Sequence, residues 1–469
     1  MINDLQRVPG SFRDPAGCVY EGDNRIFRTV NECFIQEFDQ VWASGLLEKL
    51  AGRQSVLPAK LINSDREFLQ ATEPEITYVL EIPKLPFISY PYEWTFSALK
   101  SAALLHLDIH LTALAQGMTL SDASAYNIQF QGAKPIFIDH LSFRPYKNGE
   151  VWAGHRQFCE QFLNPLLLQA YWGVSYNAWY RGAQEGIGVN DLARLVRWRD
   201  IFRGNLFMHV VLQAKFQKAS QKNALALKKD TLGAAPFSLL SFQRMLTKLQ
   251  KWVSQLEPAC NEKTVWQDYT NVHNYSSEET ALKKAFVREF SRETKPRLLW
   301  DLGCNSGDFS ATALDSGAEY VVGFDADHGA LEAAFTRAQT ENLPFQAVYM
   351  DALNPTPNQG WMERERGGLQ SRAKADGVLA LAFVHHLAIA RNVPLDQALD
   401  WIMGLAPRGV IEFVPKEDPM VHTLLRLRED IFSNYTEKKF RECIARHARI
   451  IKAQVVSKSG RLLIEYARF

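Results

Sequence analysis

The stretch Arg297–Ser310, RLLWDLGCNSGDFS, decides the fold of the C-terminal part of this chain. Its apolar run ends in Asp301, and Gly303, Asn305 and Gly307 follow before a helix-like stretch begins. Glycines at the first strand-to-helix turn of a doubly wound sheet let the backbone approach a bound nucleotide closely. The pattern therefore predicts a nucleotide-binding turn here.

Strand and helix patterns continue to alternate from this turn to Phe469, which is typical of a βαβ sheet. Asp325 lies near the end of the second strand pattern, YVVGFDAD, about where a ribose-binding carboxylate is expected. Asp351 lies near the end of the third, FQAVYMDAL. We expect an α/β domain with a doubly wound, Rossmann-like sheet over residues 291–469.

The motif DLGCNSG (residues 301–307) resembles motif I of class I S-adenosylmethionine-dependent methyltransferases, and the resemblance covers residues 290–469. It implies S-adenosylmethionine as cofactor, with the motif loop around its amino acid part. It further implies that Asp325 binds the ribose hydroxyls and that Asp351 lies near the adenine amine. The implied cofactor-binding residues are Asp301, Gly303, Asn305, Gly307, Asp325 and Asp351.

Asn305 stands where the family often has glycine. Asparagine tolerates left-handed backbone angles better than most residues, so the substitution is compatible with the motif. An NAD site is the alternative interpretation of the turn. The pattern DxGxNxG rather than GxGxxG, and the lack of a separate substrate domain after the sheet, speak against it.

The end of the fourth strand pattern carries His385 and His386, where this family usually meets its methyl acceptor. Either imidazole is a candidate general base, because histidine titrates near physiological pH. The alternative is that one histidine caps the strand while the other packs. In the fifth strand region, Glu412, Lys416 and Asp418 are expected near the same edge of the sheet as the histidines. There they either bind an acceptor or are solvated.

The segment Trp266–Lys284 precedes the sheet and is interpreted as a helical lid. Tyr269 and Tyr275 would then cover the cofactor or the acceptor, or would pack in the core instead.

A second group of candidate site residues lies in LSDASAYNIQFQGAKPIFIDHLSF (residues 120–143). Asp122 is followed by Asn127, a β-like run, a turn, another β-like run and Asp139. This layout resembles the catalytic loop of protein-kinase-like and aminoglycoside-phosphotransferase-like folds. The resemblance implies that Asp122 orients a hydroxyl acceptor and that Asn127 and Asp139 bind Mg²⁺ on the phosphates of ATP. The helix pattern over Thr95–Gln116 stands in the order that such a fold requires.

Several parts of a kinase are missing from this region. Leu120 replaces the usual histidine, and no GxGxxG loop lies near residues 17–28. Lys60, Arg25 and Arg28 are candidates for the phosphate-pairing cation, and Glu32 or Glu37 for its partner. A degenerate fold that presents substrate or senses nucleotides explains these features as well as an active kinase does.

Composition excludes several classes of protein. The hydrophobic fraction of 46% and charged fraction of 22% are ordinary globular values, so disorder and coiled coil are not expected. The 53 basic and 52 acidic side chains give a net charge of +1, without the basic excess typical of general nucleic-acid binding. The six cysteines form no CxxC pair, which favours a reduced, cytoplasmic protein. The apolar stretch at residues 377–390 is too short to span a membrane.

The whole chain resembles the NoeA-type, nodulation-protein-related, methyltransferase-like family, through FISYPYEW, DASAYNIQF, PIFIDHLSF and VHHLAIARNVPL. We expect a kinase-like module over residues 1–230, a helical connector over 231–290 and the methyltransferase domain over 291–469. The expected activity is methyl transfer to an oxygen or nitrogen of a small-molecule or glycan acceptor. The alternatives are a bifunctional kinase-methyltransferase and a non-enzymatic, nucleotide-sensing scaffold.

Overall fold

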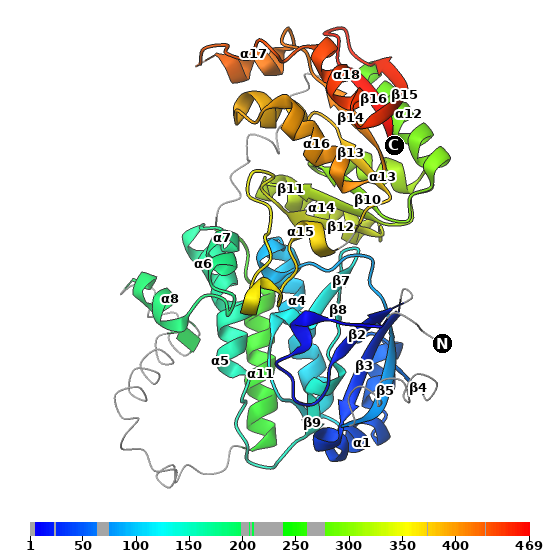
Figure 1. The fold of residues 1–469 in the computed structure, drawn as a ribbon. Coiled ribbons are helices and arrows are strands. Elements are labelled where there is room, and N and C mark those ends of the chain that lie inside the picture. Colours follow the sequence, from blue (N-terminus) through cyan, green and yellow to red (C-terminus); the bar gives the residue numbers. More distant parts are fainter. Residues whose placement is uncertain are drawn as a thin grey trace.

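The computed structural model of the 469-residue chain describes residues 5–22, 25–62, 75–197, 206, 209–210, 238–259, 277–372, 374–426 and 428–469. An N-terminal module, which runs from blue to green in Figure 1, combines a small sheet with a group of helices. The C-terminal module, which runs from green to red, is built on the seven-stranded sheet. The consecutive helices α11 and α12 lie in different modules, so the chain passes from one module to the other between residues 254 and 277.

A five-stranded antiparallel sheet of order β1-β2-β3-β5-β4 begins the N-terminal module. Its strands are β1 (Gln6–Arg7), β2 (Val19–Gly22), β3 (Arg25–Asn31), β4 (Lys60–Ile62) and β5 (Ile76–Pro83). Two helices follow β3 in the chain, α1 (Ile35–Ala43) and α2 (Leu46–Gly52). The break falls at Gly45, whose φ of 69° is left-handed, a conformation that glycine adopts at little cost.

The long helix α4 (Phe96–Leu114) begins at Thr95, whose side chain accepts a hydrogen bond from the Ala98 N–H. After α4 in the chain come two short antiparallel pairs. Strand β6 (Met118–Leu120) pairs with β9 (Phe143–Pro145), and β7 (Ile128–Gln131) pairs with β8 (Lys134–Phe137). The hairpin predicted between Asn127 and Asp139 is therefore present. Further helices of this module are α5 (His155–Phe158), the π-helical turn η6 (Cys159–Leu163), α6 (Asn164–Trp172), α7 (Asn177–Gly182), α8 (Val189–Leu195) and α11 (Leu239–Ser254).

The C-terminal sheet has the order β12-β11-β10-β13-β14-β16-β15. The first five strands are parallel, and β16 runs antiparallel between β14 and β15. The strands are β10 (Leu299–Leu302), β11 (Val321–Asp325), β12 (Phe345–Tyr349), β13 (Gly377–Ala380), β14 (Arg408–Phe413), β15 (Ala448–Val455) and β16 (Leu462–Arg468). This Rossmann-like sheet reverses its strand order between β10 and β13, so the crevice at their carboxyl ends is the expected ligand site.

Both faces of this sheet are covered, which explains why β10 and β13 are buried throughout. Helices α12, α13 and α14 come before or between the first three strands, and α16 follows β13 (Figure 1). The helices are α12 (Ser277–Thr294), α13 (Asp308–Leu314), α14 (His328–Thr340), α15 (Leu369–Arg372), the π-helical turn η11 (His386–Ala390), α16 (Leu395–Leu405), α17 (Pro419–Leu425) and α18 (Glu437–Ala445). No described helix of either module is both long enough and apolar enough to cross a bilayer.

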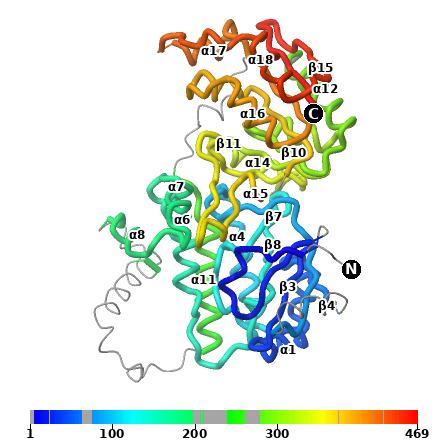
Figure 2. Tube along the Cα trace, in the orientation of Figure 1, coloured from blue at the N-terminus to red at the C-terminus, as the bar shows by residue number. Residues whose placement is uncertain are grey.

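The two modules meet through buried polar contacts. Arg372 donates hydrogen bonds of 2.6 and 2.7 Å to the two carboxylate oxygens of Glu93, and both side chains are 3% exposed. The Gln346 side chain of β12 donates to the Ser89 hydroxyl at 2.8 Å. The segment 353–372, between β12 and β13, runs as a yellow tube down to the N-terminal module in Figure 2. There the guanidinium of Arg366 lies 4.2 Å from the centre of the Tyr126 ring.

Candidate active site

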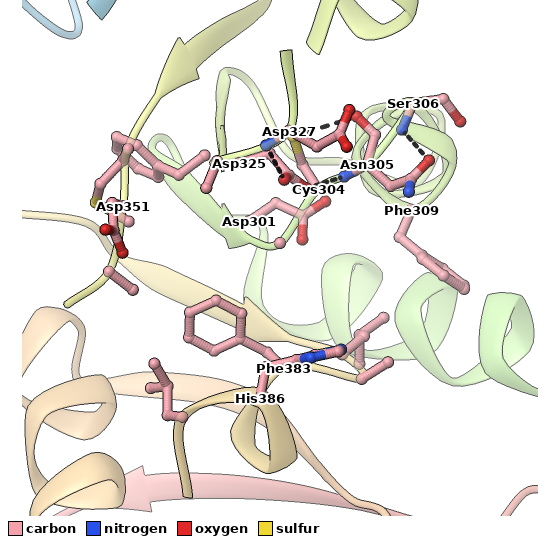
Figure 3. Close-up of a pocket in the computed structure, with 18 of the residues that line it drawn as sticks. Asp301, Cys304, Asn305, Ser306, Phe309, Asp325, Asp327, Asp351, Phe383 and His386 are labelled. Atoms are coloured by element: carbon pink, nitrogen blue, oxygen red, sulfur yellow. Dashed lines mark hydrogen bonds between the residues drawn. The ribbon is translucent and has the colours of Figure 1, made fainter. Parts of the chain in front are cut away.

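A cavity of about 610 Å³ opens at the carboxyl ends of the parallel strands, at the crevice that the strand order predicts. This volume is in the range of small-molecule and cofactor sites. Figure 3 shows Asp325, Asn305 and Asp327 on one side of the cavity and Phe383 and His386 on the other. The residues that line it include Lys283, Asp301, Gly303, Cys304, Asn305, Asp308, Asp325, Asp327, Asp351, Phe383, His386 and Arg391.

The loop after β10 has the left-handed backbone that its sequence suggests. Gly303, Asn305 and Gly307 have φ angles of 72°, 49° and 80°. A Cβ atom at Gly303 would lie 3.0 Å from the Phe383 ring, and one at Gly307 would lie 2.5 Å from the Phe345 ring. Both positions therefore exclude a side chain by space as well as by backbone angle. Gly303 and Asn305 line the cavity, whereas Gly307 shapes the turn from behind it.

Asp325, at the end of β11, holds this loop in place. One of its carboxylate oxygens accepts a hydrogen bond from the Asn305 N–H at 2.9 Å, and the other accepts from the Asp327 N–H at 2.9 Å. Burial raises the pKa of Asp325, and hydrogen bonds from the backbone N–H groups of Asp327, Asn305 and Ala326 act in the opposite direction. Since a carboxylate has about four lone-pair sites, Asp325 can support the loop and still accept a hydrogen bond from a ligand in the cavity.

Asp301, at the end of β10, is 2% exposed and accepts a hydrogen bond of 2.6 Å from the Ser310 hydroxyl. Burial raises the pKa of Asp301 to about 7, and the charge of Asp325 contributes in the same direction. Asp351 follows β12 at the other end of the cavity, where one carboxylate oxygen accepts from the Leu353 N–H at 3.0 Å. A carboxylate thus follows or ends each of the three adjacent strands β10, β11 and β12.

Charge in the cavity favours a cationic ligand. Five aspartates line it, at positions 301, 308, 325, 327 and 351, against the cations Lys283 and Arg391. Of the five, Asp308 forms an ion pair with Arg337 at 2.8 Å, and the raised pKa of Asp301 leaves it partly protonated at neutral pH. Lys283 is itself neutralised, because its ammonium lies 2.7 Å from a Glu412 carboxylate oxygen. The pyrophosphate of a dinucleotide would meet repulsion here, so the NAD alternative is disfavoured on electrostatic as well as sequence grounds.

The two histidines after β13 differ in their surroundings. His386 lines the cavity, and burial together with Arg461 lowers its pKa to about 4. His385 is 1% exposed and does not line the cavity, and its ring lies 4.1 Å from that of His386. Neither ring nitrogen of His385 has a hydrogen-bond partner among the described residues. A ligand in the cavity can therefore reach His386, whereas His385 packs in the protein interior.

Sequence reasoning missed a buried ion network next to the cavity. Glu412 is fully buried and accepts from both the Lys283 ammonium and the Ala382 N–H. Asp418 is bound by Arg461 at 2.7 Å. Neither carboxylate lines the cavity, so neither binds an acceptor there, which was one of their two expected roles. The third candidate at this edge of the sheet, Lys416, forms an ion pair with Asp430 at 2.8 Å, outside the cavity.

Part of the lid interpretation falls outside the described residues, including Tyr269 and Tyr275. The described end of that segment belongs to α12, and its residues Thr280 and Lys283 line the cavity. These two residues had no sequence signal of their own, because helical spacing alone does not reveal which face meets a cavity.

The three candidate residues of the N-terminal module lie together. The Asn127 side-chain amide donates to both carboxylate oxygens of Asp122 at 3.2 Å. The Ser142 hydroxyl lies 2.9 Å from Asp122 and 2.7 Å from Asp139. Burial and, to a lesser extent, the nearby Asp139 raise the pKa of Asp122 to about 6. Of the candidate cations, Arg28 contacts Asp14 and lies 3.8 Å from Asp139.

Comparison with known proteins gives one extensive match. The chain is 45% identical over 468 residues to the nodulation protein NoeA of Rhizobium meliloti (strain 1021), covering 98% of this chain and 96% of that protein. No family model matches.

Solved structures match the chain in part. The PH0226 protein of Pyrococcus horikoshii OT3 is 15% identical with a TM-score of 0.31, over 45% of this chain and 99% of that one. The magnesium protoporphyrin IX methyltransferase ChlM of Synechocystis PCC 6803, with bound S-adenosylhomocysteine, is 16% identical with a TM-score of 0.30, over 44% and 100%. The N-methyltransferase NodS of Bradyrhizobium japonicum WM9 is 10% identical with a TM-score of 0.30, over 40% and 87%.

Proposed function

This chain belongs to the family of the nodulation protein NoeA, and we propose that its C-terminal module is an S-adenosylmethionine-dependent methyltransferase acting on an oxygen or nitrogen acceptor. The observation that carries the proposal is the set of carboxylates at the ends of β10, β11 and β12, facing one cavity beside a left-handed turn. The resemblance of residues 290–469 to class I methyltransferases assigns these same positions to the cofactor.

The cavity suits this cofactor in charge and in size. S-adenosylmethionine supplies an electrophilic methyl group on a positively charged sulfonium, and five aspartates line the cavity. Asp325 would bind a ribose hydroxyl with its remaining lone pair, while its bonds to the Asn305 and Asp327 N–H groups fix its orientation. Asp351 would lie at the adenine end, and Asp301 near the cationic amino acid end.

His386 would contact the acceptor. Its pKa of about 4 keeps the imidazole neutral at physiological pH, so a ring nitrogen can accept a hydrogen bond from an acceptor O–H or N–H. So low a pKa makes it a weak general base in the free protein, and its main contribution would be to orient the acceptor.

The first test is calorimetric titration of the full chain with S-adenosylhomocysteine. Binding is expected, and its absence would overturn the methyltransferase proposal. Labelling of a cell extract with methyl-labelled cofactor then identifies the acceptor class. Binding without any labelled acceptor would favour the nucleotide-sensing scaffold instead.

A matched pair of histidine variants tests the role of His386. His386→Gln should slow methyl transfer to the acceptor while retaining affinity for S-adenosylhomocysteine. His422→Gln, at an exposed position on α17, should change neither quantity. Unchanged methyl transfer in His386→Gln would remove this residue from the site.

A second candidate function, phosphoryl transfer by the N-terminal module, is favoured by the cluster of Asp122, Asn127 and Asp139. Their carboxylate and amide oxygens are the ligand type that Mg²⁺ prefers. With its amide nitrogen bound to Asp122 and Ser142, the Asn127 side chain offers its oxygen as ligand atom. Arg28 lies 3.8 Å from Asp139 and would contact the phosphates.

This candidate predicts Mg-dependent ATP binding that is lost in Asp139→Asn and kept in Asp108→Asn, an exposed position on α4. S-adenosylhomocysteine binding should be intact in both variants. If the parent binds no ATP, the N-terminal module is better interpreted as a degenerate kinase-like fold that presents substrate. Methyl transfer measured with and without ATP then tests whether the two modules act on one acceptor in sequence.

A further inference from the structure

Three metal-ligating side chains converge in the helical part of the N-terminal module, outside both candidate sites. His155 begins α5 and Cys159 begins η6, four residues later, so the two side chains lie on the same face of one continuous helical stretch. His209 comes from a separate segment. The ligand atoms of His155, Cys159 and His209 all lie within 4.8 Å of one another.

The distances between these atoms fit a tetrahedral metal site. His155 Nε2 lies 3.2 Å from His209 Nδ1 and 3.7 Å from Cys159 Sγ. Tetrahedral zinc, with bonds of about 2.05 Å to nitrogen and 2.3 Å to sulfur, separates two nitrogens by about 3.3 Å and a nitrogen from a sulfur by about 3.6 Å. Two of the three distances thus match one face of a tetrahedron, and the third pair, His209 Nδ1 and Cys159 Sγ, lies within 4.8 Å.

Aromatic rings surround the two imidazoles. The Trp152 ring lies 5.4 Å from His155, and the Trp252 ring lies 5.7 Å from His209. An aromatic shell of this kind limits water, which strengthens the bonds between a metal ion and its ligands.

We propose that His155 Nε2, Cys159 Sγ and His209 Nδ1 bind a zinc ion. Two imidazoles and a thiolate favour zinc over the hard cations Mg²⁺ and Ca²⁺, which prefer oxygen. Cys159 binds as the thiolate, and its proton is released to solvent. No fourth His, Cys, Asp or Glu joins the three among the described residues, so a water molecule completes the tetrahedron.

The ion would act as a cross-link. Position 209 is separated from the His155–Cys159 turn by fifty residues of chain, and the ion would join the two through coordinate bonds. It would also tie both to α11, because Trp252 of that helix packs against His209. The site stabilises the N-terminal module and takes no part in methyl transfer, so it stands or falls independently of the proposed function.

The test uses the full chain, freed of metal with a chelator and titrated with Zn²⁺ and with Co²⁺ as a spectroscopic probe. One ion should bind per chain. Bound Co²⁺ should show a thiolate-to-metal charge-transfer band and the visible bands of tetrahedral coordination. Zn²⁺ should raise the melting temperature of the parent, because it binds only the folded chain.

Three variants decide the assignment. Cys159→Ser should remove the charge-transfer band and weaken binding by more than about 100-fold, since even residues that only support a ligand contribute 10- to 100-fold. His209→Gln should weaken binding similarly and serves if Cys159→Ser fails to fold, as judged by circular dichroism. Cys33→Ser, which removes an exposed thiol, should retain the band. The proposal is overturned if the parent shows no band, or if the band persists in Cys159→Ser.

Discussion

Replacing Asp325 with asparagine probes the cofactor site most directly, because both carboxylate oxygens already support the loop. The asparagine offers one acceptor oxygen, and its NH₂ group would face one of the two backbone N–H donors. The variant therefore loses one ribose hydrogen bond, one loop hydrogen bond and the negative charge. A hydrogen bond to a charged group contributes about 1.5–3 kcal/mol.

The loss in binding free energy should be about 2–4 kcal/mol, or 30- to 700-fold in affinity, if part of the loop cost is relieved by rearrangement. Calorimetric titration with S-adenosylhomocysteine measures it. A matched control is Asp376→Asn, which changes a carboxylate that accepts the Leu298 N–H at 3.0 Å, at the amino end of the same sheet. Equal affinities for Asp325→Asn and the parent would refute the cofactor assignment, as would an equal loss in both variants.

Three further predictions concern stability. Arg372→Met should lower the free energy of unfolding by about 3–5 kcal/mol, because it leaves the buried Glu93 carboxylate without its cation. Urea unfolding measures this, and adding Glu93→Gln should restore part of the loss. Asp301→Asn should flatten the pH dependence of stability between pH 4 and pH 7. The raised pKa of Asp301 means that the native state holds a proton that the unfolded state releases, so this residue lowers stability as pH rises through that window. Urea unfolding of the parent and the variant at pH 5 and pH 8 measures this. A stability difference between the two proteins that is the same at both pH values would contradict the prediction. Gly307→Ala should destabilise by about 1–3 kcal/mol, because its Cβ would lie 2.5 Å from the Phe345 ring, and an unchanged melting temperature would count against the turn geometry.

The C-terminal fold was predictable because local signals agreed with one another. Alternating strand and helix patterns predicted the parallel strands, and the left-handed φ of Asn305 agrees with its place in the motif. Strand ends that carry Asp301, Asp325 and Asp351 must meet at one edge of a parallel sheet, so their shared cavity follows from topology.

What sequence did not reveal depends on contacts between distant residues. Glu412 was expected to bind an acceptor or to be solvated, yet it is buried because Lys283, 129 positions away, neutralises it. The two adjacent histidines could not be distinguished by spacing, because β13 is followed by a left-handed Ala382 with a φ of 48° and then by the π-helical turn η11. Neither feature has the regular period on which pattern arguments depend.

The buried polar contacts between the two modules affect how the protein unfolds. The Gly132 N–H donates to the Tyr320 hydroxyl, and that hydroxyl lies 3.2 Å from Gln346, which also contacts Ser89. If either half opened alone, these buried groups would lose their partners while the other half remained packed. Two folds joined in this way lose their thermodynamic independence, and heat should melt them together in one cooperative step.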